Sequence, residues 1–480
     1  MMTQQNNDFY ADVFSRSSSV TGSCTLISIH FPNKKNYRIL VDCGVFQGGD
    51  TRESILNEVI PFDTKKIDSV FITHNHIDHI GLLPLLVKQG YENPIFTTVG
   101  TFRLIDIALY DSCRIKDTSI GETLYTQEDV EKTLDLLVGC SYKNILKPHK
   151  HVHVILYPNG HLIGAAIILV KISYPGRDDI NLLFTGDYNN KNKFFNVPPL
   201  PQKVKSTPIT TLFTESTYGD MDSTDPLLKP CLVDNIAEAV WSGKTVIFPA
   251  FSQGRYQEIL LILKLMQEED LLPEEICIYG DGYTGQEYTN RYLYNDLGIK
   301  KLYQNFLPRN LIMIDRKDRK IMREKIINDP KPKIIISPGG MGSYGSIQKY
   351  ISSYLSREDA LIHYLGYCSP ESHASKLIEA EHGEEVLYSG MMYTKKCDIK
   401  WTGELSAHAK RDELLAFTKS FSNLKSVLIT HGEPEVKKKY AGYLRENLSD
   451  ETKIGILNSD YAYRITENGI DKTFPTHFQL

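Results

Sequence analysis

A six-residue run at positions 74–79, His-Asn-His-Ile-Asp-His, constrains the fold and chemistry of this chain more than any other feature. Three imidazoles and a carboxylate so close together can present nitrogen and oxygen ligands on two sides of one loop. A pair of zinc ions needs such ligands, and a metal-bound hydroxide is the expected product. A flexible tail could not hold the ligands firmly, so the run must lie in a rigid part of a folded domain.

The residues on either side of the run predict its position. Residues 69–73 are largely apolar and β-branched, which is typical of a buried strand. Residues 80–87 favour a helix. We therefore expect Asp78 and His79 to lie on a strand-to-helix loop, where the backbone constrains the side chains.

Two zinc ions need more ligands than one loop offers, and three further candidates lie beside predicted strands. These candidates are His161, Asp187 and His431. The apolar runs next to them span residues 165–170, 182–186 and 427–430. Because all three candidates adjoin strand ends, we expect them to project from the same edge of a sheet.

Several short motifs, taken in order along the chain, resemble those of the metallo-β-lactamase fold. They are Asp42 in Val-Asp-Cys-Gly, the HxHxDH run, Gly160-His161, Thr185-Gly186-Asp187 and Thr430-His431-Gly432-Glu433. Three more motifs resemble those of the β-CASP nucleases, the group that contains RNase J and the cleavage-and-polyadenylation endonuclease. They are Glu215-Ser216-Thr217-Tyr218-Gly219, Ser406-Ala407-His408 and His431. Residues 19–24 and 42–48 resemble the compact bacterial type.

The resemblance implies a role for each matching residue. Two Zn²⁺ ions per chain are expected, one bound by His74, His76 and His161 and the other by Asp78, His79 and His431. Asp187 would bridge the ions, and Asp42 resembles a residue that orients a ligand histidine. The candidate catalytic residues are Asp78, His408 as general acid, and Glu215 as the partner that holds His408.

These roles predict a zinc-dependent ribonuclease that hydrolyses RNA phosphodiester bonds. Two metal ions can hold an attacking hydroxide and stabilise charge on a phosphoryl oxygen, while His408 protonates the leaving oxygen. RNA-directed members of the family resemble this chain in having histidine at position 431, where DNA-directed members have valine. The expected partner is single-stranded RNA.

Three alternatives stay open. A DNA-directed nuclease of the same family would use the same metal centre. A small-molecule hydrolase of the metallo-β-lactamase fold is a second alternative, although a large cap domain and the pair Glu215 and His408 argue against it. A metal-free scaffold that binds RNA would lack ligands, and none is missing from the sequence.

The spacing of the motifs predicts the domain plan. No motif residue appears between Glu215 and His408, and residues 220–405 have their own alternation of strands and helices. We expect an α/β protein with a metallo-β-lactamase αββα sandwich and an inserted α/β β-CASP cap domain. The sandwich would comprise residues 1–219 and 406–480, and the cap residues 220–405.

Two glycine-containing turns in the predicted cap follow strands and resemble family positions. A turn of this kind exposes backbone N–H groups at a helix N-terminus and can bind a phosphate of a nucleic acid strand. The residues concerned are Arg255, Ser337, Gly339 and Gly340. The alternative is that both turns are purely structural.

Composition agrees with a large enzyme outside the membrane. The chain has 480 residues and a net charge of −5, so a surface that binds RNA must be a local basic patch. The densest basic cluster, residues 316–323, is interpreted as a solvated helix face. No apolar stretch is long enough to cross a membrane, and the polar start at 1–7 is no signal peptide. We expect a cytoplasmic protein with no membrane partner, and the sequence leaves a homodimer open.

Overall fold

The computed structural model describes residues 8–47, 55–113, 123–294, 297–366, 368–369 and 372–476. The start at 1–7 and Gly48, the last residue of the 42–48 motif, lie outside this part of the chain. Two compact units are present. Unit 1 comprises Met1–Asn192, Asn196–Ser223 and His408–Leu480, and unit 2 comprises Lys193–Phe195 and Thr224–Ala407.

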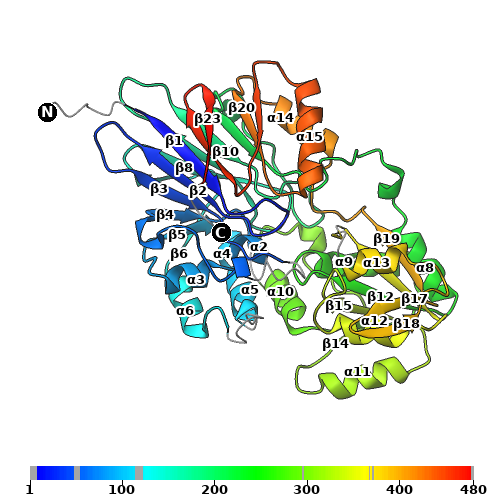
Figure 1. Ribbon diagram of the computed structural model, residues 1–480. Coiled ribbons are helices and arrows are strands. Elements are labelled where there is room, and N and C mark those ends of the chain that lie inside the picture. Colours follow the sequence, from blue (N-terminus) through cyan, green and yellow to red (C-terminus); the bar gives the residue numbers. More distant parts are fainter. Residues whose placement is uncertain are drawn as a thin grey trace. The chain divides into compact units, whose positions relative to one another are not determined.

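Unit 1 is built on two β-sheets (Figure 1). The first has the strand order β23 (Gly469–Pro475), β22 (Tyr461–Thr466), β1 (Tyr10–Ser15), β2 (Thr25–His30), β3 (Tyr37–Val41), β4 (Ser69–Phe71), β5 (Ile95–Thr98) and β6 (Leu137–Cys140). The second has the order β21 (Lys453–Ile456), β20 (Ser426–Ile429), β11 (Thr211–Thr214), β10 (Ile180–Phe184), β9 (Ala166–Ile172), β8 (Val152–Pro158) and β7 (Ile145–His149).

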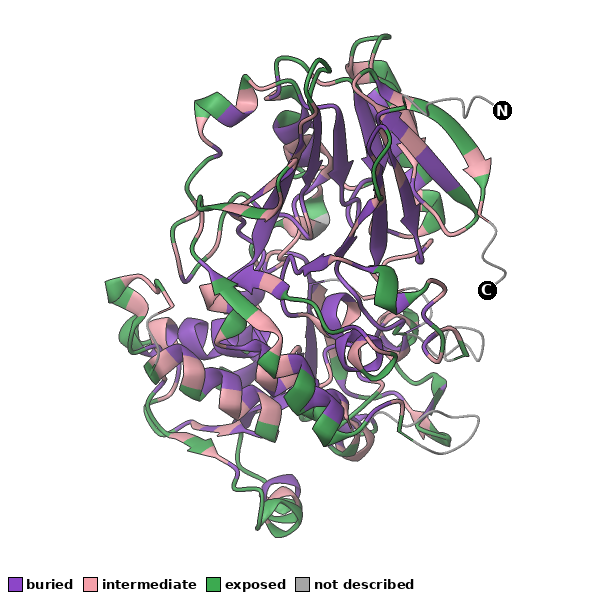
Figure 2. Cartoon of the chain, turned by 90° about the vertical axis from the view of Figure 1, so that its left-hand side faces the viewer, coloured by how far each residue is buried: buried purple, intermediate pink, exposed green. Residues whose placement is uncertain are grey.

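Neighbouring side chains on the central strands pack into different cores, because successive residues of a strand point to opposite faces. On β9, Ile168 packs between the two sheets, whereas Ile167 packs on the outer face with residues of α14 (Arg411–Lys419) and α15 (Pro434–Asn447). The outer face of the first sheet packs against α3 (Leu83–Lys88), α5 (Ile105–Ser112) and α6 (Gln127–Asp135). The layers are therefore helix, sheet, sheet and helix, and buried strands lie at the centre (Figure 2). Shorter helices of the unit include α2 (Ile77–Ile80), α4 (Val99–Phe102) and α7 (Gln202–Lys205).

The strand directions bring the ends of four strands of the second sheet to one edge. Strand β9 is antiparallel to both β8 and β10, while β10, β11 and β20 are mutually parallel. Strands β8, β10, β11 and β20 therefore run in the same direction and end at the same edge. His161, Asp187, Glu215 and His431 each follow one of these strands within three residues. Parallel pairing of β3 with β4 likewise places Asp42 beside the start of the HxHxDH run in the first sheet.

Unit 2 contains a parallel sheet and a separate hairpin. The sheet has the strand order β14 (Leu311–Met313), β13 (Cys277–Gly280), β15 (Lys333–Pro338), β12 (Thr245–Ala250), β16 (Ala360–Leu365) and β19 (Asp398–Thr402). The hairpin pairs β17 (Glu385–Tyr388) with β18 (Met391–Thr394). The helices are α8 (Leu232–Trp241), α9 (Arg255–Glu268), α10 (Tyr283–Tyr294), α11 (Arg319–Asn328), α12 (Ile347–Tyr354) and α13 (His373–Glu379). This alternation of parallel strands and helices is an α/β arrangement.

The predicted loop position of Asp78 and His79 is wrong. Both residues lie in a short helix, α2 (Ile77–Ile80), and α3 follows it as a separate helix rather than as one continuous helix over 80–87. Pro84 explains the break, because its ring would clash with the carbonyl of Ile80 in a continuous helix and it has no N–H to donate. The first turn of α2 thus presents Asp78 and His79.

No helix of the described residues is long and apolar enough to cross a lipid bilayer. In the basic cluster at 316–323, residues 316–321 are exposed, but Arg323 is half-buried and forms an ion pair with Asp281. Its guanidinium donates from Nε and Nη2 to the two carboxylate oxygens at 2.6 and 3.0 Å. The solvated-face interpretation therefore holds for the exposed residues and is wrong for Arg323.

Candidate metal centre

Backbone contacts hold the helix α2 in place. The amide of Cys43 donates to the carbonyl of His79 at 2.7 Å, and the amide of Ser23 donates to the carbonyl of Asp78 at 2.9 Å. Gly44 lies so close to this turn that a Cβ atom there would be 1.6 Å from the carbonyl oxygen of Asp78. Only glycine fits at position 44, and the tight packing fixes the backbone of both predicted ligands.

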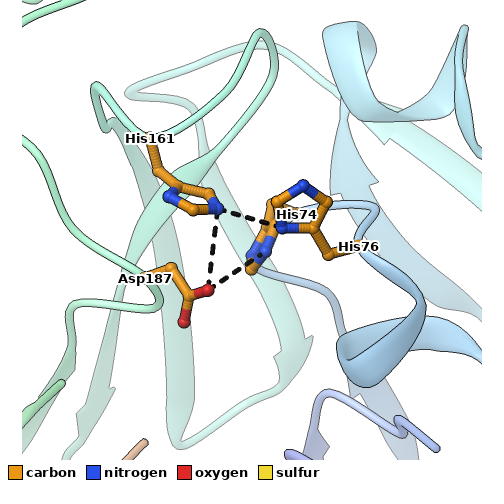
Figure 3. A group of neighbouring side chains, drawn as sticks. All are labelled: His74, His76, His161 and Asp187. Atoms are coloured by element: carbon orange, nitrogen blue, oxygen red, sulfur yellow. Dashed lines mark hydrogen bonds and ion pairs between the residues drawn. The ribbon is translucent and has the colours of Figure 1, made fainter. Parts of the chain in front are cut away.

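Four of the predicted ligands form one cluster, which we call the first ligand group. His74, His76, His161 and Asp187 each offer a ligand atom, and these atoms lie within 4.8 Å of one another (Figure 3). Nε2 of His161 is 3.1 Å from Nδ1 of His76, and Oδ2 of Asp187 is 3.6 Å from Nε2 of both His74 and His161. Residues 85 positions apart in the chain thus converge on a volume that fits one ion.

The other three predicted ligands form a second ligand group, whose ligand atoms also lie within 4.8 Å of one another: Asp78, His79 and His431. Oδ1 of Asp187 faces this group, at 3.2 Å from Nε2 of His79 and 3.3 Å from Nε2 of His431. The two oxygens of Asp187 therefore face different groups. A carboxylate in this position is suited to contact two cations at once.

The buried polar atoms of the site fit a bound metal. Four ligand atoms are buried and have no hydrogen-bond partner among the described residues: Nε2 of His74, Nε2 of His79, Oδ1 of Asp187 and Nε2 of His431. Leaving buried polar atoms unpaired is costly, so native proteins rarely do it without a function for them. Imidazole nitrogens and a carboxylate are the donor set that zinc prefers. The cluster could hold metal ions.

The electrostatic environment keeps His74 and His76 neutral, the state that binds a cation, whereas the raised pKa of His79 favours an imidazolium that must lose a proton before it can bind one. Burial lowers the pKa of His74 well below its usual range and the pKa of His76 to about 4. Burial alone would also lower the pKa of His79, but Asp187 and Asp42 outweigh it and raise that pKa well above its ordinary value. Burial opposes ionisation of Asp187, yet the surrounding histidines hold its pKa well below its usual range. An ionised Asp187 among imidazoles is a ready cation site.

Asp42 contacts the histidines of both groups, directly or through Thr73. Its Oδ2 lies 2.8 Å from Nδ1 of His79 and accepts the hydroxyl of Thr73 at 2.8 Å. Oγ1 of Thr73 lies 3.1 Å from Nδ1 of His74. Asp42 has a φ of +60°, a strained value for a residue with a side chain. The left-handed backbone conformation of Asp42 thus points its carboxylate toward the ligand histidines.

Glu215 and His408 pair beside the ligand groups. Nδ1 of His408 is 3.0 Å from Oε1 and 2.9 Å from Oε2 of Glu215. The ring of His408 lies 4.7 Å from the ring of His161 and 5.8 Å from the ring of His431, measured between centroids. The structure therefore brings the two residues together as predicted, within reach of both groups.

Three residues that contact the predicted ligands escaped sequence reasoning. Asn159 links two ligand loops, because its side-chain amide donates to the carbonyl of Asp187 and its Oδ1 accepts the amide of His161 at 3.0 Å. Thr73 and Thr217 contact ligand histidines through their hydroxyls. Thr73 directly precedes the run at 74–79 and Thr217 lies in the motif at 215–219, but a hydroxyl in the sequence does not indicate which imidazole it will contact. Only Asn159 had a local signal, because Pro-Asn-Gly at 158–160 is typical of a turn.

The four predicted phosphate contacts lie in unit 2, at the ends of the parallel strands β12 and β15. Ser337 is fully buried, and its hydroxyl lies 2.7 Å from that of Ser346. Gly339 has a φ of +114° and donates its amide to the carbonyl of Ala250 at 3.0 Å. Gly340 follows it in the same turn. Arg255 is buried at the start of α9 and pairs with Glu258. Their contact with phosphate stays a prediction.

Comparison with known families agrees with the geometry of the site. Residues 33–217 match the metallo-β-lactamase superfamily domain, and residues 256–377 match the Beta-Casp domain. Residues 392–455 match the Zn-dependent metallo-hydrolase RNA specificity domain. The chain belongs to the β-CASP family of metallo-β-lactamase-fold hydrolases. The predicted fold class is therefore confirmed.

Several curated proteins resemble this β-CASP chain over most of its length. Transcription termination factor FttA of Methanosarcina mazei is 28% identical over 90% of this chain and 68% of its own length. Ribonuclease TTHA0252 of Thermus thermophilus is 27% identical over 88% of this chain and 93% of its own length. Endoribonuclease ysh1 of Emericella nidulans is 32% identical over 54% of this chain and 29% of its own length.

Proposed function

We propose that this β-CASP chain is a zinc-dependent ribonuclease that hydrolyses phosphodiester bonds in single-stranded RNA. The observation that carries the proposal is the position of Asp187 between two ligand groups with the pair of Glu215 and His408 beside them. Two of the relatives named above are called a ribonuclease and an endoribonuclease. The histidine at position 431 favours RNA over DNA.

Each residue of the centre has a specific task in this proposal. The first ligand group would hold one zinc ion and the second ligand group another, with Asp187 contributing an oxygen to each. Bound zinc would supply Lewis acidity that polarises a phosphoryl oxygen. His408 donates a proton to the leaving oxygen, and Glu215 holds the His408 ring through Nδ1. Asp42 orients His79 and, through Thr73, His74.

The test compares substrates on one purified preparation. Metal content is measured by plasma mass spectrometry, and single-stranded RNA labelled at either terminus is incubated with the protein and with Asp187→Asn. We expect close to two zinc ions per chain and cleavage of RNA that chelation stops and zinc restores. The same strand made of DNA and an RNA duplex serve as matched substrates, and both should be cut more slowly.

The alternatives give different results in the same assay. Equal cleavage of RNA and DNA would replace the RNA preference with a DNA-directed or unselective nuclease. Hydrolysis of lactones or thioesters without any cleavage of nucleic acid would indicate a small-molecule hydrolase. RNA binding without metal and without cleavage would indicate a scaffold.

A further inference from the structure

Three buried histidines of the metal centre share one arrangement. In His74, His79 and His431, Nε2 faces Asp187 at 3.6, 3.2 and 3.3 Å. In each of them, Nδ1 lies within hydrogen-bond distance of an oxygen. The oxygens belong to Thr73, Asp42 and Thr217, at 3.1, 2.8 and 3.1 Å. Ligand histidines in proteins commonly use such a contact to fix the ring and its tautomer.

We propose that Thr217 is a positioning residue of the second ligand group: its hydroxyl accepts the Nδ1–H of His431 and so presents Nε2 as the ligand nitrogen. The inference rests on the proposed zinc centre and deepens it. A neutral imidazole carries one proton, so a proton on Nδ1 leaves the lone pair on Nε2. Thr217 thus fixes the ring of His431 through Nδ1, as Asp42 fixes the ring of His79.

Different residues contact the backbone of His431 and the Nδ1 side of its ring. The residue follows β20 with a φ of +36°, an uncommon and strained backbone conformation for histidine. The neighbouring Ser216 secures the backbone, because its amide donates to the carbonyl of His431 at 2.9 Å and its hydroxyl donates to that of Thr430 at 2.9 Å. Thr217 is buried and is the residue of this segment that contacts the ring itself.

The same short segment also reaches the candidate general acid. Glu215 pairs with His408, and its Oε2 accepts the amide of Thr217 at 3.2 Å. Three consecutive residues after β11 therefore contact different parts of the site. Glu215 contacts the candidate general acid His408, Ser216 contacts the backbone of His431, and Thr217 contacts the ring of His431. Parallel pairing of β11 with β20 makes this possible, because it aligns Thr214 with Ile429 and brings both strand ends to the same place.

The test separates the hydroxyl from the packing of the side chain. Thr217→Val keeps the shape and removes the acceptor, whereas Thr217→Ser keeps the hydroxyl. Thr418→Val is the matched control, since Thr418 is also buried in unit 1 and its hydroxyl donates to the carbonyl of Leu414 at 2.8 Å. Zinc affinity is measured by competition with a chelator, and the second site is probed by the visible spectrum of the cobalt-substituted protein.

We expect Thr217→Val to weaken binding of one of the two zinc ions by about 10- to 100-fold and to alter the cobalt spectrum. Thr217→Ser should restore both, and Thr418→Val should change neither. Thr217→Ala serves as a second variant if Thr217→Val fails to fold. Wild-type zinc affinity and cobalt spectrum in both Thr217→Val and Thr217→Ala would overturn the inference about Thr217 and leave the proposed zinc centre in place. A wild-type protein that binds no divalent metal would overturn the proposed zinc centre and the inference with it.

Discussion

Nδ1 of His408 lies 2.9 Å from Oε2 of Glu215, although the two residues are 193 positions apart in the sequence. Glu215 is fully buried, and its other oxygen accepts the amide of Tyr188 at 2.5 Å. A carboxylate held at both oxygens cannot follow a rotating imidazole, so it fixes the orientation of the His408 ring. His408 also has a nitrogen within 4.8 Å of ligand atoms of Asp187 and His431, which allows either an acid or a ligand role.

Substitution of His408 distinguishes these two roles. His408→Ala should slow RNA cleavage by about 10²- to 10⁴-fold, the usual contribution of a general acid, and should retain both zinc ions. Single-turnover rates and metal content provide the measurements. The exposed His382 is a matched control, and His382→Ala should leave the rate unchanged. Loss of a zinc ion from His408→Ala would assign His408 as a ligand instead.

Asp187 should be the least replaceable ligand, because its two oxygens face different ligand groups. Asp187→Asn should abolish cleavage and release at least one zinc ion, since a neutral amide is a much weaker zinc ligand than a carboxylate. Circular dichroism should show an unchanged fold. Asp179→Asn, at an exposed position before β10, provides the control. Two tightly bound zinc ions in Asp187→Asn would contradict a bridging role.

Asp42→Asn should weaken zinc binding by about 10- to 100-fold, because the amide can no longer accept from His79 and Thr73 together. Chelator competition measures the change. Thr73→Val should show a smaller loss, since it removes the hydroxyl that contacts Asp42 and His74 but keeps the contact between Asp42 and His79. Asp471→Asn, at an exposed site, should have wild-type affinity. An unchanged affinity in Asp42→Asn would show that the carboxylate serves the fold and not the metal.

Lys437 gives unit 1 a pH-dependent stability. Its Nζ is buried and donates to the carbonyl of Ser18 at 2.8 Å and to that of Leu457 at 3.4 Å. Burial lowers its pKa from 10.5 to about 8. Below pH 8 both the folded and the unfolded chain carry the proton on Lys437, so the unfavourable free energy of burying this charge is fully present. As the pH rises above 8 the folded chain loses the proton first, so stability rises.

The effect is measured against a variant without the titrating group. Relative to Lys437→Met, the wild-type free energy of unfolding should increase by about 2 kcal/mol between pH 8 and pH 9.5. Urea denaturation at several pH values provides the measurement. Lys438→Met is the matched control, because Lys438 is exposed and pairs with Glu435 on the surface. A parallel pH dependence in wild type and Lys437→Met would contradict the lowered pKa.

The ion pair of Asp281 and Arg323 should stabilise unit 2. The carboxylate of Asp281 is almost fully buried, so Arg323→Met would leave a buried charge without its partner. We expect a loss of about 3 kcal/mol in the free energy of unfolding. Lys349→Met is the control, because Lys349 and Glu324 form an exposed pair that should contribute at most about 1 kcal/mol. Equal effects of the two substitutions would contradict the expected difference.

Many residues of the candidate site could be proposed from the sequence because the signal depends on residue types at short range. The run at 74–79 combines ligand types that zinc prefers, and the apolar segments before Asp187 and His431 indicated the strands that precede them. The αββα order of layers followed from a family resemblance rather than from periodicity. The position of Asp78 and His79 was misjudged, although Pro84 carried the signal that α2 and α3 are separate helices.

Tertiary structure alone decided which atoms meet. The two oxygens of Asp187 face different groups, and the hydroxyl of Thr217 meets His431 across 214 residues of chain. Those contacts depend on strand register, because a shift of one residue between β11 and β20 would turn each side chain to the opposite face. Local sequence specifies the ligands and their strands, whereas the pairing of distant strands specifies the geometry that makes them one site.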